Sequence, residues 1–420
     1  MLQLSTSSTV AASARPITAV VTRSVDLIVA LLLLLLASPL LLWHSVRSPY
    51  QAFRCKRMLG RARRPFTFWR CARSRAASDL ATLVNVLNGS MSFAGPRPVA
   101  ADDDLSALAD SHFVLRPGIF SVAATRTNMG LEFEDEKRLD EELLAGWGLK
   151  AYLSLITKGL MACLLNGHVP RASPQQFRLF GVRIDNWTME NSLDWVLHSA
   201  DDTSRRRRFA FVNPDCLNTA YHHQDYRAAL DAMDCVFPDG SGIRLACRLV
   251  GINQRANVNG TDMFPLLCER MAVTGQSLFL LGARPGIADA VADNMRARYP
   301  GLNIAGTQDG YFDAADTDDV IVTINQSGAS VLLVAFGAPR QELWLHEHAS
   351  ALTVPVAAGV GGLFDFYSGR IPRAPLWMRE TGLEWIWRLT QEPRRMWRRY
   401  VLGNPLFVMR VIRQRMNKRV

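Results

Sequence analysis

The stretch LLVAFGAPRQELW, residues 332–344, carries the clearest signal for the fold of this chain. A short apolar run ends at Gly337 and Pro339, and a cation, an amide and a carboxylate follow at residues 340–342. Short apolar runs bounded by turn residues are typical of buried strands. The stretch therefore predicts a buried strand, a turn that presents polar side chains, and then a helix.

The same pattern recurs several times in the second half of the chain. Further apolar runs are FAFV (209–212), CVF (235–237), SLFLL (277–281), LNIAG (302–306) and VPVAAGV (354–360). Amphipathic stretches such as residues 215–233 and 286–299 lie between them. Apolar strands that alternate with helices predict an α/β fold with a mostly parallel sheet and helices on both faces.

Polar or glycine-rich loops follow the predicted strands, at NPD (213–215), PDGSG (238–242), GARPG (282–286) and residues 337–342. Ligands of open parallel sheets bind beyond the carboxyl ends of the strands, so we expect these loops to face one crevice. Gly240 and Gly242 would let the backbone come close to a ligand, and N–H groups at a helix N-terminus suit a phosphate. Asp239 is a candidate catalytic carboxylate at this rim, or simply the cap of the following helix.

The composition limits the class of protein and its partners. The 420 residues are 49% apolar and 20% charged, which suits two folded domains better than a disordered chain. The net charge of +10 favours anionic partners such as nucleic acid, phosphorylated small molecules or acidic lipids. The arginine run at residues 205–208 precedes a predicted strand and is interpreted as a solvated edge, so we expect no nucleic acid partner.

Neither a cofactor nor a metal is predicted. The seven cysteines include no CxxC pair, which fits reduced thiols in a cytoplasmic compartment, and no GxGxxG motif follows a predicted strand. The histidines of HEH (346–348) and HH (222–223) lie in helical patterns, where neighbouring side chains point to different faces.

Residues 27–43, LIVALLLLLLASPLLLW, predict that the N-terminal region meets a membrane surface. The segment is marginal in length for a membrane span, and Pro39 favours a kink. A span, a hairpin that re-enters one leaflet and a cleaved signal peptide are the alternatives. A basic cluster follows before any acidic residue and predicts the cytoplasmic side: Arg47, Arg54, Lys56, Arg57, Arg61, Arg63 and Arg64.

Changes in composition divide the chain into four segments. We predict a membrane-associated part (1–165), a polar linker (166–178), the sheet domain (179–383) and a basic tail (384–420). Interleaved cations and aromatic residues in the tail are typical of a membrane-surface helix or a clamp for a phosphorylated lipid, with an ordinary terminal helix as the alternative. At helical spacing Arg388, Arg395 and Arg399 share one face, unless Pro393 breaks the helix.

From about residue 180 onward the chain resembles the WecG/TagA/CpsF glycosyltransferases. The resemblance rests on the order of GVRIDNWTMENSLDWV (181–196), VNPDCLNTA (212–220), VFPDGSGIRLA (236–246), NGTDMFPLLCE (259–269), GTQDGYF (306–312), AFGAPRQELW (335–344), the run from GVGGLF (359–364) to RRMWRRY (394–400), and GNP (403–405). It implies a Rossmann-like fold and a metal-independent, inverting enzyme. The sugar, an N-acetylmannosamine type among the candidates, would pass from a UDP-sugar to a polyprenyl-pyrophosphate-linked acceptor. The setting would be surface polysaccharide or exopolysaccharide synthesis at the cytoplasmic face of the bacterial inner membrane.

The same resemblance implies roles for individual residues. Asp239 matches the aspartate proposed as general base, and a carboxylate there can take the proton of the attacking hydroxyl. The implied donor-binding residues are Asn213, Asp215, Gly240, Gly242, Thr261, Asp262, Gln341 and Glu342. The implied contacts to the acceptor pyrophosphate are Arg388, Arg394, Arg395, Arg398 and Arg399. Asn257 and Asn259 depart from the family pattern, which carries a basic residue early in that motif.

Residues from about 23 to 159 resemble a different family, the monotopic polyprenyl-phosphate sugar-1-phosphate transferases. The cues include LVNVLNGSMSFAGPRPV (83–99) and LRPGI (115–119), but the family's Asp-Glu pair falls here on Ser78 and Asp79. A serine lacks the carboxylate that forms the phosphosugar intermediate, so this half is interpreted as a degenerate anchor. A bifunctional enzyme and a non-catalytic assembly scaffold are the alternatives, and a homo-oligomer is left open.

Overall fold

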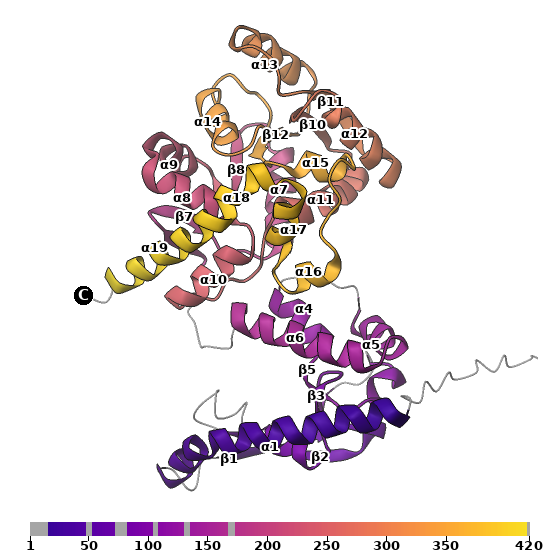
Figure 1. The fold of residues 1–420 in the computed structure, drawn as a ribbon. Helices are drawn as coiled ribbons and strands as arrows, with labels where there is room; N and C mark the ends of the chain where they lie inside the picture. The colour runs from indigo at the N-terminus through magenta and orange to yellow at the C-terminus, as the bar shows by residue number, and fades with distance from the viewer. Residues whose placement is uncertain are drawn as a thin grey trace, which may run out of the picture. The chain divides into compact units, whose positions relative to one another are not determined.

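The computed structural model describes residues 16–47, 53–71, 82–103, 108–129, 135–166 and 173–417 (Figure 1). The chain forms two compact units, residues 1–169 and residues 170–420. Ser78 and Asp79 lie outside the described residues.

The first unit combines one long apolar helix with small sheets and short helices. Its helices are α1 (Pro16–Arg47), α3 (Leu83–Leu87), α4 (Val122–Met129), α5 (Glu136–Ala145) and α6 (Leu149–Asn166). One sheet pairs β1 (Phe53–Leu59) with β2 (Pro65–Cys71) and β4 (Val99–Ala100), and a second pairs β3 (Ser92–Ala94) with β5 (Gly118–Phe120).

Helix α1 is held to this unit by two polar side chains on one face. Arg23 donates a hydrogen bond to the carbonyl oxygen of Val86 at 2.6 Å. The buried Asp26 carboxylate accepts from the Tyr152 hydroxyl at 2.7 Å and from the Phe93 amide at 3.0 Å. Because a buried charge is costly unless it is paired or hydrogen-bonded, these contacts determine which face of α1 packs inward.

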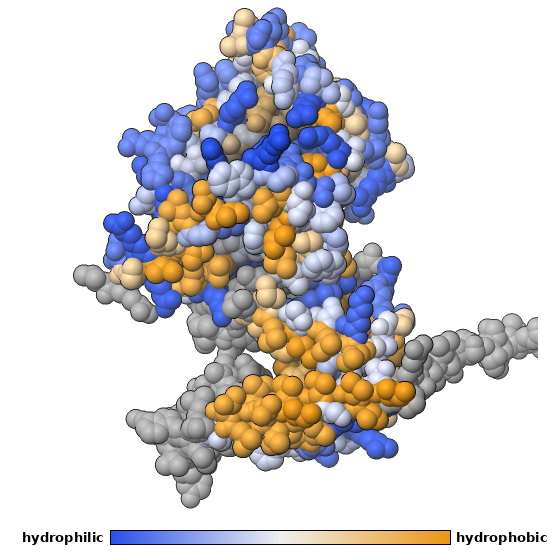
Figure 2. Space-filling view, viewed as in Figure 1, coloured by the Kyte–Doolittle hydropathy of each residue, from blue (hydrophilic) through white to orange (hydrophobic). Residues whose placement is uncertain are grey.

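The opposite face of α1 is exposed and apolar, as the continuous hydrophobic surface in Figure 2 shows. Segment Ile17–Leu36 is long and apolar enough to cross a membrane by length and composition. Within the described residues α1 continues through Pro39 as a single helix, without the second arm of a hairpin.

The second unit is built on a six-stranded parallel sheet with the order β11-β10-β12-β13-β8-β9. Its strands are β8 (Arg207–Val212), β9 (Cys235–Pro238), β10 (Ser277–Gly282), β11 (Asn303–Gln308), β12 (Val331–Ala335) and β13 (Val356–Gly359). All six apolar runs singled out in the sequence are therefore strands of this sheet. A separate hairpin of β6 (Gln176–Leu179) and β7 (Val182–Asp185) precedes it.

Helices cover both faces of the sheet, as predicted. They are α7 (Met189–Asp201), α8 (Pro214–His222), α9 (Gln224–Asp231), α10 (Ser241–Val250), α11 (Gly260–Thr274), α12 (Ile287–Arg298), α13 (Thr317–Gln326), α14 (Arg340–Glu347), α15 (Leu363–Tyr367) and α16 (Leu376–Glu380). Successive residues of a strand point to opposite faces, so Phe209 packs into one core and Ala210 into the other.

The basic tail is part of the second unit rather than a separate appendage. It forms α17 (Glu384–Gln391), α18 (Pro393–Trp397), a π-helical turn (Arg398–Leu402) and α19 (Gly403–Asn417). Helix α19 packs on α8 and α10, and Phe407 and Val411 are buried in the core beneath it. Glu392, with φ −132° and ψ 62°, breaks the helix before Pro393, so Arg388 lies on a different helix from Arg395.

Because Phe407 is 1% exposed, Phe407→Ala should lower the free energy of unfolding of the second unit by about 3 kcal/mol or more. Met409, on the same helix, is 60% exposed, so Met409→Ala should change it by less than about 0.5 kcal/mol. Urea unfolding followed by tryptophan fluorescence measures both variants. Equally small effects would show that α19 does not belong to the core.

Candidate functional site

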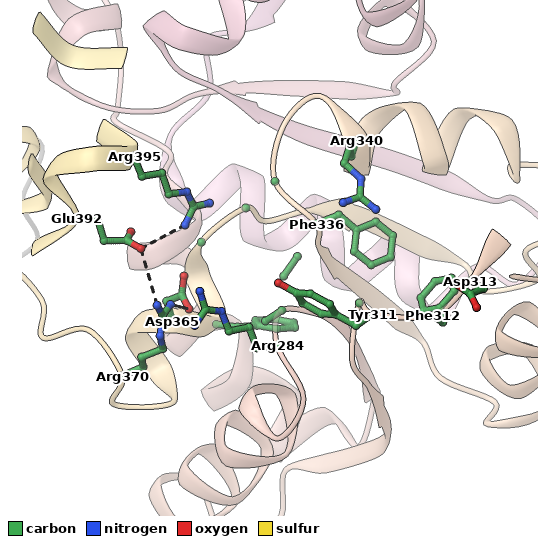
Figure 3. Close-up of a pocket in the computed structure, with 17 residues that line it drawn as sticks. Arg284, Tyr311, Phe312, Asp313, Phe336, Arg340, Asp365, Arg370, Glu392 and Arg395 are labelled. Atoms are coloured by element: carbon green, nitrogen blue, oxygen red, sulfur yellow. Dashed lines mark hydrogen bonds and ion pairs between the residues drawn. The ribbon is translucent and has the colours of Figure 1, made fainter. Parts of the chain in front are cut away.

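The loops at the carboxyl edge of the sheet enclose a cavity of about 550 Å³ (Figure 3). Its walls come from the loops after β10, β11, β12 and β13 and from the start of α18. Four aromatic residues line it: Tyr311, Phe312, Phe336 and Phe364. Four guanidinium groups also line it, from Arg284, Arg340, Arg370 and Arg395, together with the carboxylates of Asp313, Asp365 and Glu392. Stacking surfaces beside cations suit a ligand with an aromatic ring and an anionic group.

The turn after β12, residues 337–342, forms one wall of this cavity. Gly337 has φ +81°, which glycine adopts without strain, and the Ala338–Pro339 peptide is cis. The guanidinium of Arg340 lies 6.0 Å from the centre of the Phe336 ring and forms no ion pair with the described residues.

Gln341 and Glu342 point into the protein instead of into the cavity. The Gln341 Oε1 atom accepts hydrogen bonds from the amides of Gly337 at 3.1 Å and Gly361 at 2.9 Å, and thereby joins two cavity loops. Its Nε2 group donates to Glu342 at 2.7 Å. A methyl group on Gly359 would lie 2.7 Å from the Gln341 side chain, so this site needs glycine. The amide of Gln341 thus acts as a clamp between loops.

Burial of Glu342, which is 0% exposed, raises the pKa of its carboxyl to about 7, while the hydrogen bond from Gln341 lowers it. Its Oε2 atom has no hydrogen-bond partner among the described residues. Such a carboxyl is held close to its titration point at neutral pH.

Asp239 lies at the end of β9 and is partly buried. Its backbone amide donates to the carbonyl oxygen of Val212 at 2.9 Å, which joins the ends of β8 and β9. Burial, and to a smaller extent the charge of Glu384, raise the pKa of the Asp239 carboxyl to about 6. Arg399 and a hydrogen bond from Asn213 oppose this shift. A carboxylate with a pKa near neutrality suits a general base.

The two glycines after Asp239 are explained by contacts within the protein. Gly240 has φ +91°, and its amide donates to the Asn257 side chain at 2.7 Å. A methyl group on Gly242 would lie 2.3 Å from Pro214, so this glycine allows α10 to pack against α8. The departure noted at Asn257 therefore has a structural role, because this side chain holds the turn that carries Asp239.

Two further predicted donor residues begin α8, next to Asp239. Asn213 caps the helix and accepts from the amides of Asp215 and Cys216 at 3.1 and 3.2 Å. The Asp215 carboxylate pairs with Arg399 at 3.4 Å. This ion pair connects the tail to the loop after β8.

Thr261 and Asp262 begin α11 and also have partners within the protein. The carbonyl oxygen of Thr261 accepts from the Tyr367 hydroxyl at 2.6 Å. Asp262 pairs with Arg373 and accepts from the Asn259 side chain at 2.6 Å.

The five tail arginines do not form one cluster. Arg388 and Arg395 pair with Glu392, at 3.6 and 3.4 Å, and Arg395 lines the cavity. Arg399 lies near Asp239, whereas Arg394 and Arg398 are exposed on the surface.

Several charged residues at the carboxyl edge of the sheet were not predicted from the sequence. Glu384, Glu392, Arg284, Arg370 and Arg373 were not singled out, because nothing in their local spacing distinguishes them from surface charges. One available signal was the position of Glu392, an acid immediately before a helix-breaking proline within a basic run. In the described part of the chain, no group of three or more His, Cys, Asp or Glu residues could hold a metal ion.

Comparison with known proteins agrees with the sequence resemblance. Residues 177–420, more than half of the chain, match the Glycosyl transferase WecG/TagA/CpsF family. The chain belongs to this family. It is therefore a glycosyltransferase, and the predicted resemblance is confirmed. Residues 70–166 match a second family, described as Bacterial sugar transferase, which confirms the resemblance of the N-terminal half.

Two relatives of this glycosyltransferase carry the same name, N-acetylglucosaminyldiphosphoundecaprenol N-acetyl-beta-D-mannosaminyltransferase. The protein of Bacillus subtilis strain 168 is 32% identical over 208 residues, which cover 50% of this chain and 80% of the relative. The protein of Bacillus spizizenii strain W23 is 32% identical over 222 residues, which cover 52% of this chain and 85% of the relative.

In the glycosyltransferase, Gln341→Ala should free the Gly337 and Gly361 amides and speed their hydrogen exchange by roughly fivefold to tenfold. Exchange followed by mass spectrometry on peptides that cover residues 336–342 and 359–363 measures the effect. Arg340→Ala is the matched control, because Arg340 is exposed and the Gly337 and Gly361 amides donate to Gln341 instead. Unchanged exchange in Gln341→Ala would show that Gln341 is not a clamp.

Proposed function

We propose that this glycosyltransferase moves a sugar of the N-acetylmannosamine type from a UDP-sugar to a polyprenyl-diphosphate-linked sugar acceptor. The main support is Asp239, a carboxyl with a pKa near 6 on the same sheet edge as a cavity lined by cations and aromatic rings. The names of the two relatives point to the same donor sugar and the same class of acceptor.

The cavity is the proposed site for the nucleotide of the donor. Tyr311 is 72% exposed and offers a ring face on which a uracil can stack. Arg284, Arg340, Arg370 and Arg395 can bind the two phosphates, since guanidinium groups form paired hydrogen bonds with phosphate oxygens. Their charge would also stabilise the UDP that leaves as the glycosidic bond breaks.

Asp239 is the proposed general base for the acceptor hydroxyl. The oxygen of this hydroxyl attacks the anomeric carbon from the face opposite UDP, and Asp239 takes its proton as the new bond forms. Displacement from the opposite face inverts the anomeric centre. Asn213 and Gly240 then have positioning roles, through the hydrogen bond to the carboxyl and the φ of +91° in the turn.

Several arginines near Asp239, at the carboxyl edge of the sheet, are candidate partners for the diphosphate of the acceptor. Arg399 pairs with Asp215, and its charge lowers the pKa of the nearby Asp239 carboxyl. The Nε atoms of Arg373 and Arg379 are buried without a hydrogen-bond partner in the described part of the chain. Buried donors without acceptors favour the binding of an anion.

The first unit is the proposed membrane anchor. The exposed apolar face of α1 and the basic residues that follow it suit the cytoplasmic face of the bacterial inner membrane. In the second unit, Trp377, Trp397 and Met416 are exposed and are further candidates for contact with a membrane. We place the reaction in surface polysaccharide synthesis, where lipid-linked acceptors are extended.

A bifunctional enzyme is the second candidate, because residues 70–166 match a family of bacterial sugar transferases. The serine at position 78, where that family carries an aspartate, speaks against phosphosugar transfer by the first unit.

If Asp239 is the general base, Asp239→Asn should lower kcat by roughly 100-fold or more, because the amide cannot accept the proton. Affinity for UDP should stay close to wild type. Transfer to a soluble short-chain lipid-diphosphate acceptor and calorimetry with UDP measure the two quantities. Full turnover in the variant would remove Asp239 from the mechanism.

The pH dependence of kcat should follow the same carboxyl. Asp239 works as a base only when deprotonated, so kcat should fall as the pH drops through about 6 and level off above about 7. Glu384→Gln should move the inflection to lower pH, because the charge of Glu384 raises the pKa of Asp239. A profile that is flat between pH 5 and 7, the window around that pKa, would contradict this assignment.

A further inference from the structure

Glu392 is an acidic residue inside the cation cluster that borders the cavity. Its carboxylate lies 3.4 Å from Arg395, 3.6 Å from Arg388 and 3.9 Å from Arg370. Figure 3 shows it between Arg395 and Arg370. Three guanidinium groups around one anion form the arrangement that would otherwise receive a phosphate.

The contacts of Glu392 are loose. Charge-assisted hydrogen bonds between guanidinium and carboxylate are usually about 2.7–2.9 Å long, and all three distances exceed this range. The Oε2 atom is buried and has no hydrogen-bond partner among the described residues. By contrast, Arg370 is held by Asp365 at 2.6 Å. Glu392 therefore balances the charge of the cluster without being tightly bound to any member.

Two of the three arginines are held in place by other groups. Arg370 keeps its short ion pair with Asp365. The Arg388 guanidinium lies 4.7 Å from the centre of the Phe366 ring, and a methyl group on Gly362 would come within 2.5 Å of it. These two cations would keep their positions if the charge of Glu392 were removed.

Glu392 also stands where the backbone changes direction. It separates α17 from α18, and its φ and ψ are not helical. Its amide donates to the carbonyl oxygen of Arg388 and its carbonyl oxygen accepts from the amides of Arg395 and Met396, so the carboxylate can turn away from the cluster only through rotation of its own side chain.

We propose that Glu392 is a built-in counter-anion that competes with the diphosphate of the nucleotide for Arg370, Arg388 and Arg395. This inference rests on the proposed function, in which the cavity holds the donor nucleotide. The carboxylate stabilises the empty site and opposes the incoming diphosphate. It thereby weakens the binding of UDP and favours release of this product after each transfer.

The test is calorimetry of UDP and, separately, inorganic pyrophosphate on the full chain in detergent. Glu392→Gln keeps the shape and removes the charge, so it should bind UDP roughly fivefold more tightly than wild type, the effect of one ion pair with partly exposed arginine partners. Glu392→Asp keeps the charge and should bind within about twofold of wild type. Glu347→Gln is the distant control, since the Glu347 side chain is 74% exposed and lies outside the cavity lining.

The outcomes separate this inference from the proposed function. Unchanged or weaker binding of UDP by Glu392→Gln would overturn the counter-anion role, while the donor site would stand. If wild type binds pyrophosphate but not UDP, the nucleotide assignment fails, and the same variants decide the role of Glu392 with pyrophosphate. If wild type binds neither, both proposals fail.

Discussion

Arginine side chains crowd the carboxyl edge of the sheet, and their mutual repulsion must be balanced before any substrate arrives. The protein achieves this with carboxylates from distant parts of the chain. Asp365 and Glu392 balance Arg370, Asp262 pairs with Arg373, and Asp215 pairs with Arg399. These pairs attach the tail and the loop after α15 to the sheet edge. The same side chains that shape the site therefore also stabilise its empty state.

The edge has two regions with different chemistry. The cavity beside β10, β12 and β13 combines aromatic rings with guanidinium groups, while the region beside β8 and β9 holds a carboxyl with a raised pKa. The C-terminal segment runs between them, because Arg395 lines the cavity and Arg399 reaches Asp215. The proposed reaction joins two anionic substrates and would use both regions, and the tail has residues in both.

The GAPRQE motif illustrates how a functional motif can act indirectly. Its glutamine was expected to bind the donor, but in the structure its amide joins the loops that carry Gly337 and Gly361, and its glutamate is wholly buried. Because both loops line the cavity, the motif supports the walls of the proposed donor site without lining it through Gln341 or Glu342. A role in direct donor contact stays a prediction for both side chains.

The sequence by itself determined the six strands, the parallel sheet and the place of Asp239 at a strand end, because hydrophobic runs and turn residues are local properties. It also placed an apolar helix near the N-terminus. Only the tertiary structure decided the order of the strands, the burial of α19 in the core and the division of the tail arginines between Glu392, Asp215 and the surface. These features depend on contacts between residues far apart in the chain. An arginine has the same local pattern whether it faces solvent, a carboxylate or a ligand, so only its partners in space define its role.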